Sequence, residues 1–249
     1  MIKVITFDLW DTVFIDDSDE PKRKAEGRLS KRDERRQLVF EYANKHKKVS
    51  KEHVDIIYKT VDTAFRKVWQ EQFITWQVAD RLEIIFKGLD VELSADEMSE
   101  IVRRHEEMEL EFKPDFIEGV AEAIKVLHKD YTLAVISDAI FSPGRVLREL
   151  LKSQDLLQYF DHFVFSDEIG SAKPKPIVFE SVYEKFNIQS GELVHIGDRE
   201  HNDILGPIKM NSHSILCTAA IDRDSKNTRA AAVFSDYEEL PSIIKSFKF

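Results

Sequence analysis

Seven polar residues lie at or near the ends of apolar stretches in this sequence, and their types suit one kind of reaction. They are Asp8 with Asp11, Ser137 with Asp138, Lys173, and Asp198 with Asp203. If they converge, their oxygens could hold a hard cation, and the lysine could neutralise an anion beside it. A carboxylate nucleophile, a divalent cation, a lysine and a hydroxyl donor are the groups that phosphoryl transfer needs. We therefore expect Asp8 to attack in line while the cation and Lys173 offset charge on the phosphoryl oxygens.

These residues can meet only if the stretches before them are neighbouring parallel strands. Apolar stretches predict strands at 3–7, 131–138, 162–167, 193–198 and 214–217. Helical patterns alternate with the later strands, at 119–128, 145–152, 176–186, 203–210 and 238–246. This alternation predicts an α/β fold with a Rossmann-like, doubly wound parallel sheet. Such sheets bind ligands at the carboxyl ends of their strands, where the polar residues would lie.

The stretch from residue 22 to about 112 differs from the rest, because it carries helical patterns and almost no strand signal. Apolar spacing predicts one helix around residues 35–43, and Ser50, Thr75 and Ser94 are candidate N-caps of three more. Four amphipathic helices suffice for a small bundle. We therefore expect a catalytic core of residues 1–15 and 116–249, interrupted by an all-helical, four-helix cap domain at residues 16–115.

The composition restricts the classes of function. The 249 residues carry a net charge of -10, which argues against general nucleic-acid binding. The single cysteine, Cys217, excludes an intramolecular disulfide and fits a reducing compartment. We see no signal peptide, and no apolar run approaches the ~20 residues needed to span a bilayer. We expect a cytoplasmic protein that does not act at a membrane, and the oligomeric state is unknown at this point.

Several other conspicuous residues are interpreted as structural. The basic residues at 22–24 and 28–36 are expected to form a solvated helix face. Aromatic residues between 65 and 76 recur at a helical spacing that is typical of bundle core. His195, inside a predicted strand, is expected to be a hydrogen-bonded core histidine, whereas His105 in the cap is expected to be exposed.

The four polar groups, in this order, resemble the four motifs of the haloacid dehalogenase superfamily. Asp8 corresponds to the nucleophile of that family, Ser137 to the hydroxyl that binds the phosphoryl group, and Lys173 to the lysine of the third motif. Gly197-Asp198 with Asn202-Asp203 resembles the acidic fourth motif, and the predicted cap lies where the family has one.

The resemblance implies a covalent intermediate on Asp8 and Mg²⁺ between Asp8 and Asp198. Asp203 would be a further ligand or a support, and the backbone carbonyl of Trp10 would also face the metal. Ser137, Asp138 and the backbone near Leu9 and Trp10 would bind the substrate's phosphoryl group. The partner would then be a small phosphorylated metabolite.

One position departs from the family pattern. Phosphatases of this family read Asp-x-Asp-Gly-Thr, whereas this chain reads Asp8-Leu9-Trp10-Asp11-Thr12. Trp10 replaces the aspartate that serves as general acid and base, and an indole has no proton to exchange near neutral pH. Asp11 could substitute if the backbone turns its side chain inward. Otherwise the acid comes from the cap, or the enzyme handles only good leaving groups.

The departure leaves alternatives beside the Mg²⁺-dependent phosphomonoester hydrolase that we expect. Metal-independent 2-haloacid dehalogenases of the family carry an aromatic residue at the position of Trp10, but they generally lack an acidic fourth motif like Asp198 and Asp203. A phosphonate hydrolase would need a cap lysine that forms a Schiff base, and no lysine is singled out. A third alternative is a weakened, non-catalytic member that binds a phosphometabolite or a partner protein.

Overall fold

A parallel sheet of six strands lies at the centre of the structure, a computed structural model that describes residues 1–247. The strand order is β3-β2-β1-β4-β5-β6. The strands are β1 (Val4–Phe7), β2 (Thr132–Ser137), β3 (His162–Phe165), β4 (Leu193–Gly197), β5 (His213–Cys217) and β6 (Ala232–Phe234). The predicted fold class is confirmed. The short edge strand β6 was not predicted, because three residues are too few to produce a clear apolar pattern.

The register of the central strands aligns their carboxyl ends. Phe7, the last residue of β1, is paired with Val135 of β2 on one side and with Ile196 of β4 on the other. All four residues of β1 are buried, as expected for a central strand of a parallel sheet. The residues that follow β1, β2 and β4 therefore emerge at the same edge of the sheet.

Helices cover both faces of the sheet, which makes it doubly wound. Successive residues of β1 point to opposite faces, so that Val4 packs into one apolar cluster and Ile5 into another. The cluster around Ile5 includes residues of α7 (Val120–Leu127), α8 (Gly144–Lys152) and α12 (Leu240–Ser246). The cluster around Val4 includes residues of α10 (Pro176–Phe186). Short elements connect these layers: η1 (Leu157–Tyr159), α9 (Ser166–Ile169), η2 (Ser190–Glu192), η3 (Glu200–Ile204), α11 (Leu205–Lys209) and η4 (Ser225–Asn227).

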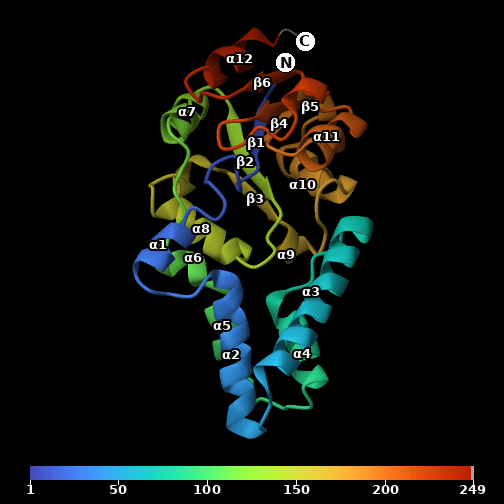
Figure 1. The fold of residues 1–249 in the computed structure, drawn as a ribbon. Coiled ribbons are helices and arrows are strands. Elements are labelled where there is room, and N and C mark those ends of the chain that lie inside the picture. The colour runs from blue at the N-terminus through green and yellow to red at the C-terminus, as the bar shows by residue number, and fades with distance from the viewer. Residues whose placement is uncertain (248–249) are drawn as a thin grey trace.

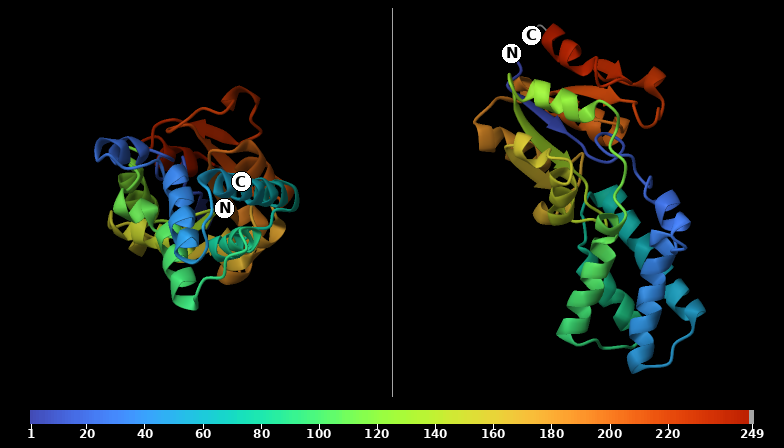
Figure 2. Two further views of the ribbon diagram at one scale, coloured as in Figure 1. Left: turned by 60° about the horizontal axis from the view of Figure 1, so that its bottom comes forward. Right: turned by 90° about the vertical axis from the view of Figure 1, so that its left-hand side faces the viewer.

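The helical segment between β1 and β2 extends away from the carboxyl edge of the sheet (Figures 1 and 2). It comprises α1 (Glu20–Ala25), α2 (Lys31–His46), α3 (Lys51–Gln72), α4 (Val78–Gly88), α5 (Ala95–Glu106) and α6 (Met108–Glu111). The long helices α2 to α5 surround an apolar cluster of their own, which includes Leu38, Leu82 and Ile101. We call this segment the cap; its boundaries at residues 16 and 115 stay a prediction.

Side-chain caps begin three of the four long helices. Ser30, Ser50 and Ser94 each accept a hydrogen bond from the backbone N–H three residues later. The prediction that Thr75 caps a helix was wrong. The N-cap of α4 is Gln77, two residues after Thr75, and Gln77 forms a capping box with Asp80.

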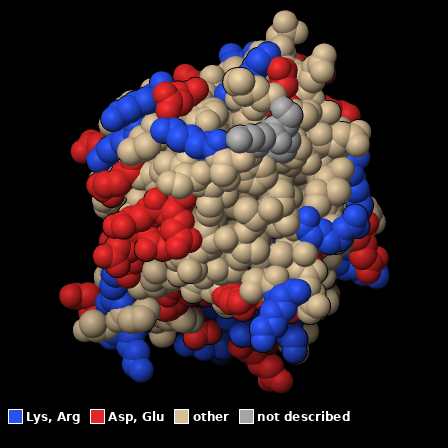
Figure 3. Space-filling view, turned by 90° about the horizontal axis from the view of Figure 1, so that it is seen from above, with Lys and Arg blue, Asp and Glu red and all other residues tan. Residues whose placement is uncertain are grey.

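The face opposite the cap carries charged side chains of both signs around a mostly uncharged centre (Figure 3). No helix within residues 1–247 is both long enough and apolar enough to cross a membrane.

His105 of α5 is fully buried inside the cap, so the expectation that it is exposed was wrong. Its Nδ1 lies 2.8 Å from the carbonyl oxygen of Ile101, and its ring stacks on Tyr58. Its Nε2 has no partner among the described residues. Burial and the nearby Arg35 guanidinium lower the pKa of His105 from 6.5 to about 3. The imidazole is therefore neutral in the folded protein over most of the pH range.

This burial predicts a loss of stability in mild acid. Between pH 6.5 and about 3, the unfolded chain binds a proton at His105 that the folded chain does not bind. The free energy of unfolding should therefore fall by up to ~1.4 kcal/mol per pH unit below pH 6.5 through this group. In the variant His105→Phe this contribution is absent. Urea unfolding at pH 7.5, 6.5, 5.5 and 4.5 should show the variant gaining stability relative to the wild type; parallel profiles would contradict the assignment.

Candidate active site

Four charged side chains meet at the carboxyl edge of the sheet. Asp8 follows β1, Asp198 follows β4, Asp203 lies in the π-helical turn η3, and Lys173 reaches in from the loop after α9. One carboxylate oxygen from each of the three aspartates lies within 4.8 Å of the others. The structure thus brings together the residues that the sequence singled out for metal and nucleophile.

The Lys173 ammonium group joins two of these carboxylates. Its Nζ lies 2.8 Å from Asp8 Oδ1 and 2.6 Å from Asp203 Oδ1, and it donates a 3.1 Å hydrogen bond to the carbonyl oxygen of Ile136. Burial opposes the charge of Lys173, but the carboxylates of Asp203, Asp8 and Asp138 outweigh it and raise the pKa of the ammonium group. A permanent cation therefore orients Asp8, the candidate nucleophile.

Asp203 is held on all sides. Its Oδ1 contacts Lys173 and lies 3.2 Å from His195 Nε2, and its Oδ2 accepts a 2.9 Å hydrogen bond from the backbone N–H of Arg199. Despite burial, Lys173 and His195 lower the pKa of Asp203. Burial lowers the pKa of His195, so its ring is neutral. The ring donates a hydrogen bond from Nε2 to Asp203, and its Nδ1 accepts one from the hydroxyl of Thr6 at 2.8 Å. His195 is thus the predicted hydrogen-bonded core histidine, and it also positions Asp203.

Only one of the two carboxylate oxygens of Asp198 has a hydrogen-bond partner among the described residues. Its Oδ2 accepts a 2.6 Å hydrogen bond from Nε of Arg223, whereas its buried Oδ1 has no partner among residues 1–247. Burial, together with Asp203 and Asp8, raises the pKa of Asp198 to about 7. A buried carboxylate oxygen without a donor is costly, and a divalent cation would satisfy it. The donor set, all oxygen and all anionic, fits Mg²⁺ between Asp198 and Asp8. Because both oxygens of Asp203 are occupied, that residue fits the supporting role better than the ligand role.

The loop after Asp8 turns sharply and decides where the side chains of Trp10 and Asp11 lie. The carbonyl oxygen of Leu9 accepts hydrogen bonds from the N–H groups of Thr12, Val13 and Phe14. The Trp10 ring packs edge-on against Phe14, with ring centroids 5.0 Å apart.

Asp11 adopts a left-handed backbone with φ of 54° and is buried. Its Oδ2 lies 2.6 Å from Nη2 of Arg223, and its Oδ1 accepts a 3.0 Å hydrogen bond from the N–H of Asp16. The loop places Asp11 beside Arg223, which also binds Asp198. Both carboxylate oxygens of Asp11 are engaged there as acceptors, one by the Asp16 N–H and the other by the Arg223 guanidinium.

Two buried hydroxyls near the cluster lack a hydrogen-bond partner among the described residues: Ser137 Oγ and Thr12 Oγ1. Asp138 accepts a 3.0 Å hydrogen bond from the Lys173 N–H and a 3.3 Å hydrogen bond from Nδ2 of Asn202. Burial raises its pKa to about 7. Unsatisfied buried hydroxyls are rare in folded proteins, and the Ser137 hydroxyl, beside Asp138, is a donor without an acceptor among residues 1–247.

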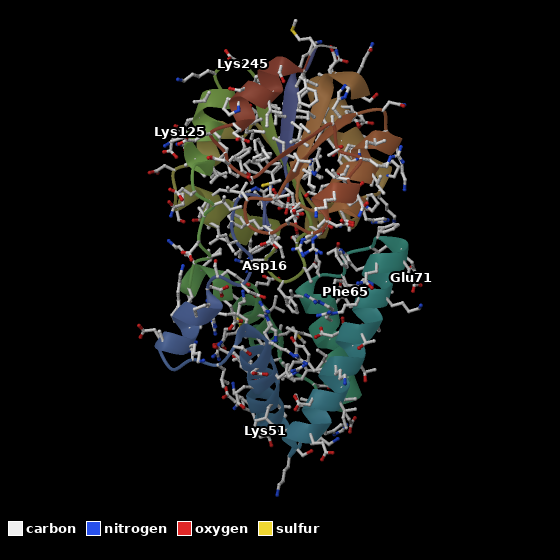
Figure 4. The ribbon with its side chains drawn as sticks, turned by 45° about the horizontal axis from the view of Figure 1, so that its top comes forward. Asp16, Lys51, Phe65, Glu71, Lys125 and Lys245 are labelled. Carbon is white, nitrogen blue, oxygen red and sulfur yellow. The ribbon has the colours of Figure 1, made fainter. Side chains whose placement is uncertain are left out.

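A cavity of about 800 Å³ lies between the sheet edge and the cap. Asp8, Trp10, Asp138, Lys173 and Asp203 line its floor, and residues of α2, α3 and α4 line its walls. Asp16 and Phe65, both lining residues, lie between the core and the far end of the cap in Figure 4. The site is therefore large enough for a small molecule and is enclosed by both parts of the chain.

Sequence reasoning misjudged the basic stretch and missed two arginines. Lys31 and Arg35 are buried and line the cavity, so this stretch is not simply a solvated helix face. Arg223 and Arg81 carry no motif, and only the folded chain brings them to the site. Of the aromatic run, Phe65 is buried as expected, whereas Trp69 is half-buried.

Comparison with known proteins places these features in context. The model of the family described as "Haloacid dehalogenase-like hydrolase" matches residues 32–217 of this chain. The glyceraldehyde 3-phosphate phosphatase of Pyrococcus abyssi is 30% identical over 83 residues, which are 33% of this chain and 34% of that protein. The pyrophosphatase PpaX of Listeria monocytogenes is 26% identical over 159 residues, 59% of this chain and 69% of that protein. The matches to the first curated relatives cover only about a third to two fifths of those proteins.

Solved structures match along nearly the whole chain. A 2-haloacid dehalogenase from Pseudomonas syringae pv. Tomato DC3000 superposes with a TM-score of 0.70 at 22% identity, covering 98% of this chain and 99% of that one. A HAD phosphatase from Thermococcus onnurineus superposes with a TM-score of 0.65 at 20% identity, covering all of both chains. At these identities the likeness establishes a shared fold.

The close approach of Asp203 to β4 yields a prediction about Gly197. A Cβ atom at Gly197 would lie 2.4 Å from Cγ of Asp203, so Gly197→Ala must displace the carboxylate that Lys173 and His195 hold. We expect a loss of ~1–3 kcal/mol in the free energy of unfolding. Gly191→Ala is the matched control, because no atom lies within 4 Å of a Cβ there, and it should change stability by under ~0.5 kcal/mol. Equal urea midpoints for the two variants would contradict the packing argument.

Proposed function

We propose that this chain, which belongs to the haloacid dehalogenase-like hydrolases, is a Mg²⁺-dependent phosphatase that acts on small phosphorylated substrates through Asp8. The observation that carries the proposal is the unpartnered oxygen of Asp198 beside Asp8, because a metal-free mechanism gives this buried carboxylate no role. The phosphatases among its relatives support it, whereas the dehalogenase fold match is neutral between the two activities.

The chain's own residues would carry the reaction in two steps. In the first, an oxygen of Asp8, oriented by Lys173, attacks phosphorus as the bond from phosphorus to the ester oxygen breaks. Lys173, the Ser137 hydroxyl and the backbone near Leu9 and Trp10 would neutralise the phosphoryl oxygens, and Asp138 would hold the loop of Lys173 in place. In the second step, water attacks the phosphorus of the aspartyl-phosphate, the bond from phosphorus to the Asp8 oxygen breaks, and phosphate leaves with the protons of the water.

Mg²⁺, when bound, would supply positive charge against the phosphoryl oxygens. Asp8, Asp198 and the Trp10 carbonyl would hold it, and Asp203 would support them through Lys173.

Leaving-group protonation is where this chain would differ from its relatives. Trp10 cannot protonate an alkoxide, and Asp11 is paired with Arg223. We therefore favour substrates whose leaving groups need little protonation, such as acyl or aryl phosphates, over simple alkyl phosphates.

One observation favours a second candidate function, the hydrolysis of 2-haloacids. Trp10 is an aromatic residue that lines the same cavity as Asp8. Asp8 would then attack carbon, halide would leave, and no metal would be required.

The two candidates differ in steady-state assays of the wild type. We expect turnover of an aryl phosphate that requires Mg²⁺ and is abolished by EDTA, with alkyl phosphate turnover slower by ~10²–10⁴ because a general acid is missing. A 2-haloacid, assayed in parallel with and without metal, should not be hydrolysed. Halide release without metal would overturn the phosphatase proposal in favour of the second candidate.

Two substitutions separate the roles of the aspartates. Asp8→Asn should abolish aryl phosphate turnover, because an amide cannot act as the nucleophile; Asp96→Asn, an exposed change of the same kind on α5, should leave it unchanged.

Asp11→Asn should reduce aryl and alkyl turnover by the same small factor, since Asp11 acts only through Arg223. A selective ~10²–10⁴ loss on the alkyl ester would instead make Asp11 the general acid. Binding without turnover in the wild type would support a non-catalytic member of the family.

A further inference from the structure

Arg81 of α4 is a buried cation that the proposed reaction does not use. Its side chain is only 3% exposed, yet it lines the cavity that also contains Asp8 and Lys173. The guanidinium lies over the Phe65 ring at 4.5 Å and over the Phe141 ring at 4.2 Å from their centroids. Phe65 belongs to α3 and points toward the interior between core and cap (Figure 4). These stacking contacts hold the guanidinium plane in one orientation.

The charge of Arg81 is not matched by a carboxylate. Among residues 1–247 it forms no ion pair, its Nη2 donates to the carbonyl oxygen of Ile140, and its Nε has no partner. Asp62 and Glu106 are close enough to act on Arg81 electrostatically, but neither forms an ion pair with it. Burying an unpaired guanidinium is costly, and a bound anion would offset that cost.

The neighbouring buried cations differ from Arg81 in this respect. Lys31 lies 2.7 Å from Asp19 and 3.3 Å from Glu109, and Arg35 lies 3.6 Å from Glu109 and donates to the carbonyl oxygen of His105. The carboxylates of the chain therefore neutralise Lys31 and Arg35. Among these three buried cations within residues 1–247, Arg81 is the one whose charge a ligand would have to match.

A second unsatisfied donor lies on the adjacent helix. The indole Nε1 of Trp69 is buried and has no acceptor within the described residues, and Trp69 also lines the cavity. Trp69 is four residues after Phe65 on α3, so the two rings project from the same face of that helix. Two N–H donors without acceptors, one of them charged, favour an oxyanion as the missing ligand.

We propose that Arg81, assisted by Trp69, binds a second anionic oxygen group of the substrate and selects phosphorylated compounds that carry such a group. This inference rests on the proposed function, because it takes the cluster around Asp8 and Lys173 as the phosphoryl site. One end of the substrate would lie at that cluster on the cavity floor, and its carboxylate or second phosphate would lie against the cap wall. Arg81 and Trp69 are specificity residues here and take no part in bond breaking.

Binding of non-hydrolysable ligands tests this without turnover. The probes are ω-phosphonoalkanoates with two to six carbons, each paired with its uncharged ω-amide, titrated by calorimetry in Mg²⁺. We expect the wild type to bind at least one carboxylate about 10- to 100-fold more tightly than its amide, as a charge-assisted hydrogen bond would require. In Arg81→Gln that ratio should fall to about 1, with amide affinity changed by less than about threefold.

Matched variants exclude indirect explanations. Arg66→Gln removes the same charge from an exposed residue that lines the same cavity, and it should keep the wild-type preference. Trp69→Phe removes one N–H and keeps an aromatic ring, so it should lower the preference by several-fold; it also tests the site if Arg81→Gln does not fold.

Four outcomes count against the proposal. Equal binding of acids and amides by the wild type would overturn it and leave the phosphoryl site standing. A preference that survives in both Arg81→Gln and Trp69→Phe, or that Arg66→Gln removes equally, would also overturn it. No binding of any phosphonate or of inorganic phosphate would overturn the proposed function together with this inference.

Discussion

The contact on which the rest of the site depends is the Lys173 ammonium group between the carboxylates of Asp8 and Asp203. Lys173 Nζ lies within 2.8 Å of both carboxylates, with almost no water access. A buried carboxylate or ammonium alone would be costly, and each is stable here only because the others are present. His195, Thr6 and the Arg199 backbone extend the network by fixing Asp203. Because Lys173 contacts both Asp203 and Asp8, these residues also help to orient the candidate nucleophile Asp8.

Charge at this edge is unbalanced in one direction. Lys173 forms ion pairs with Asp8 and Asp203, and Arg223 forms one with Asp198. One carboxylate oxygen of Asp198 still has no partner among the described residues. Across the cavity the imbalance is reversed, since Arg81 is buried without a carboxylate of its own. A cation at the floor and an anion at the wall would correct both, which is the charge pattern of a metal-bound substrate with two anionic ends.

The cap and the core meet at two segments that lie next to site residues. The segment that follows β2 supplies the Ile140 carbonyl to Arg81, the Phe141 ring to Arg35 and Arg81, and the Ser142 hydroxyl to Glu109. On the other side, the N–H of Ala172 donates to the carbonyl oxygen of Phe73, one residue before Lys173. Both groups of contacts join the cap to segments adjacent to site residues. A movement of the cap would therefore shift residues of the site.

The sequence by itself determined the parallel sheet and the convergence of Asp8, Ser137, Lys173, Asp198 and Asp203. Apolar strands that end in polar residues must place them at one edge, because carboxyl ends of parallel strands lie side by side. Only the tertiary structure decided the partners: Arg223 bridging Asp11 and Asp198, His195 bracing Asp203, and Arg81 buried without an anion. Sequence patterns also misplaced His105, which is buried within the cap, and Lys31 and Arg35 of the basic stretch, which are buried at its cavity. Periodicity reports which face of a helix is apolar, whereas the burial and pairing of a long charged side chain depend on segments distant in sequence.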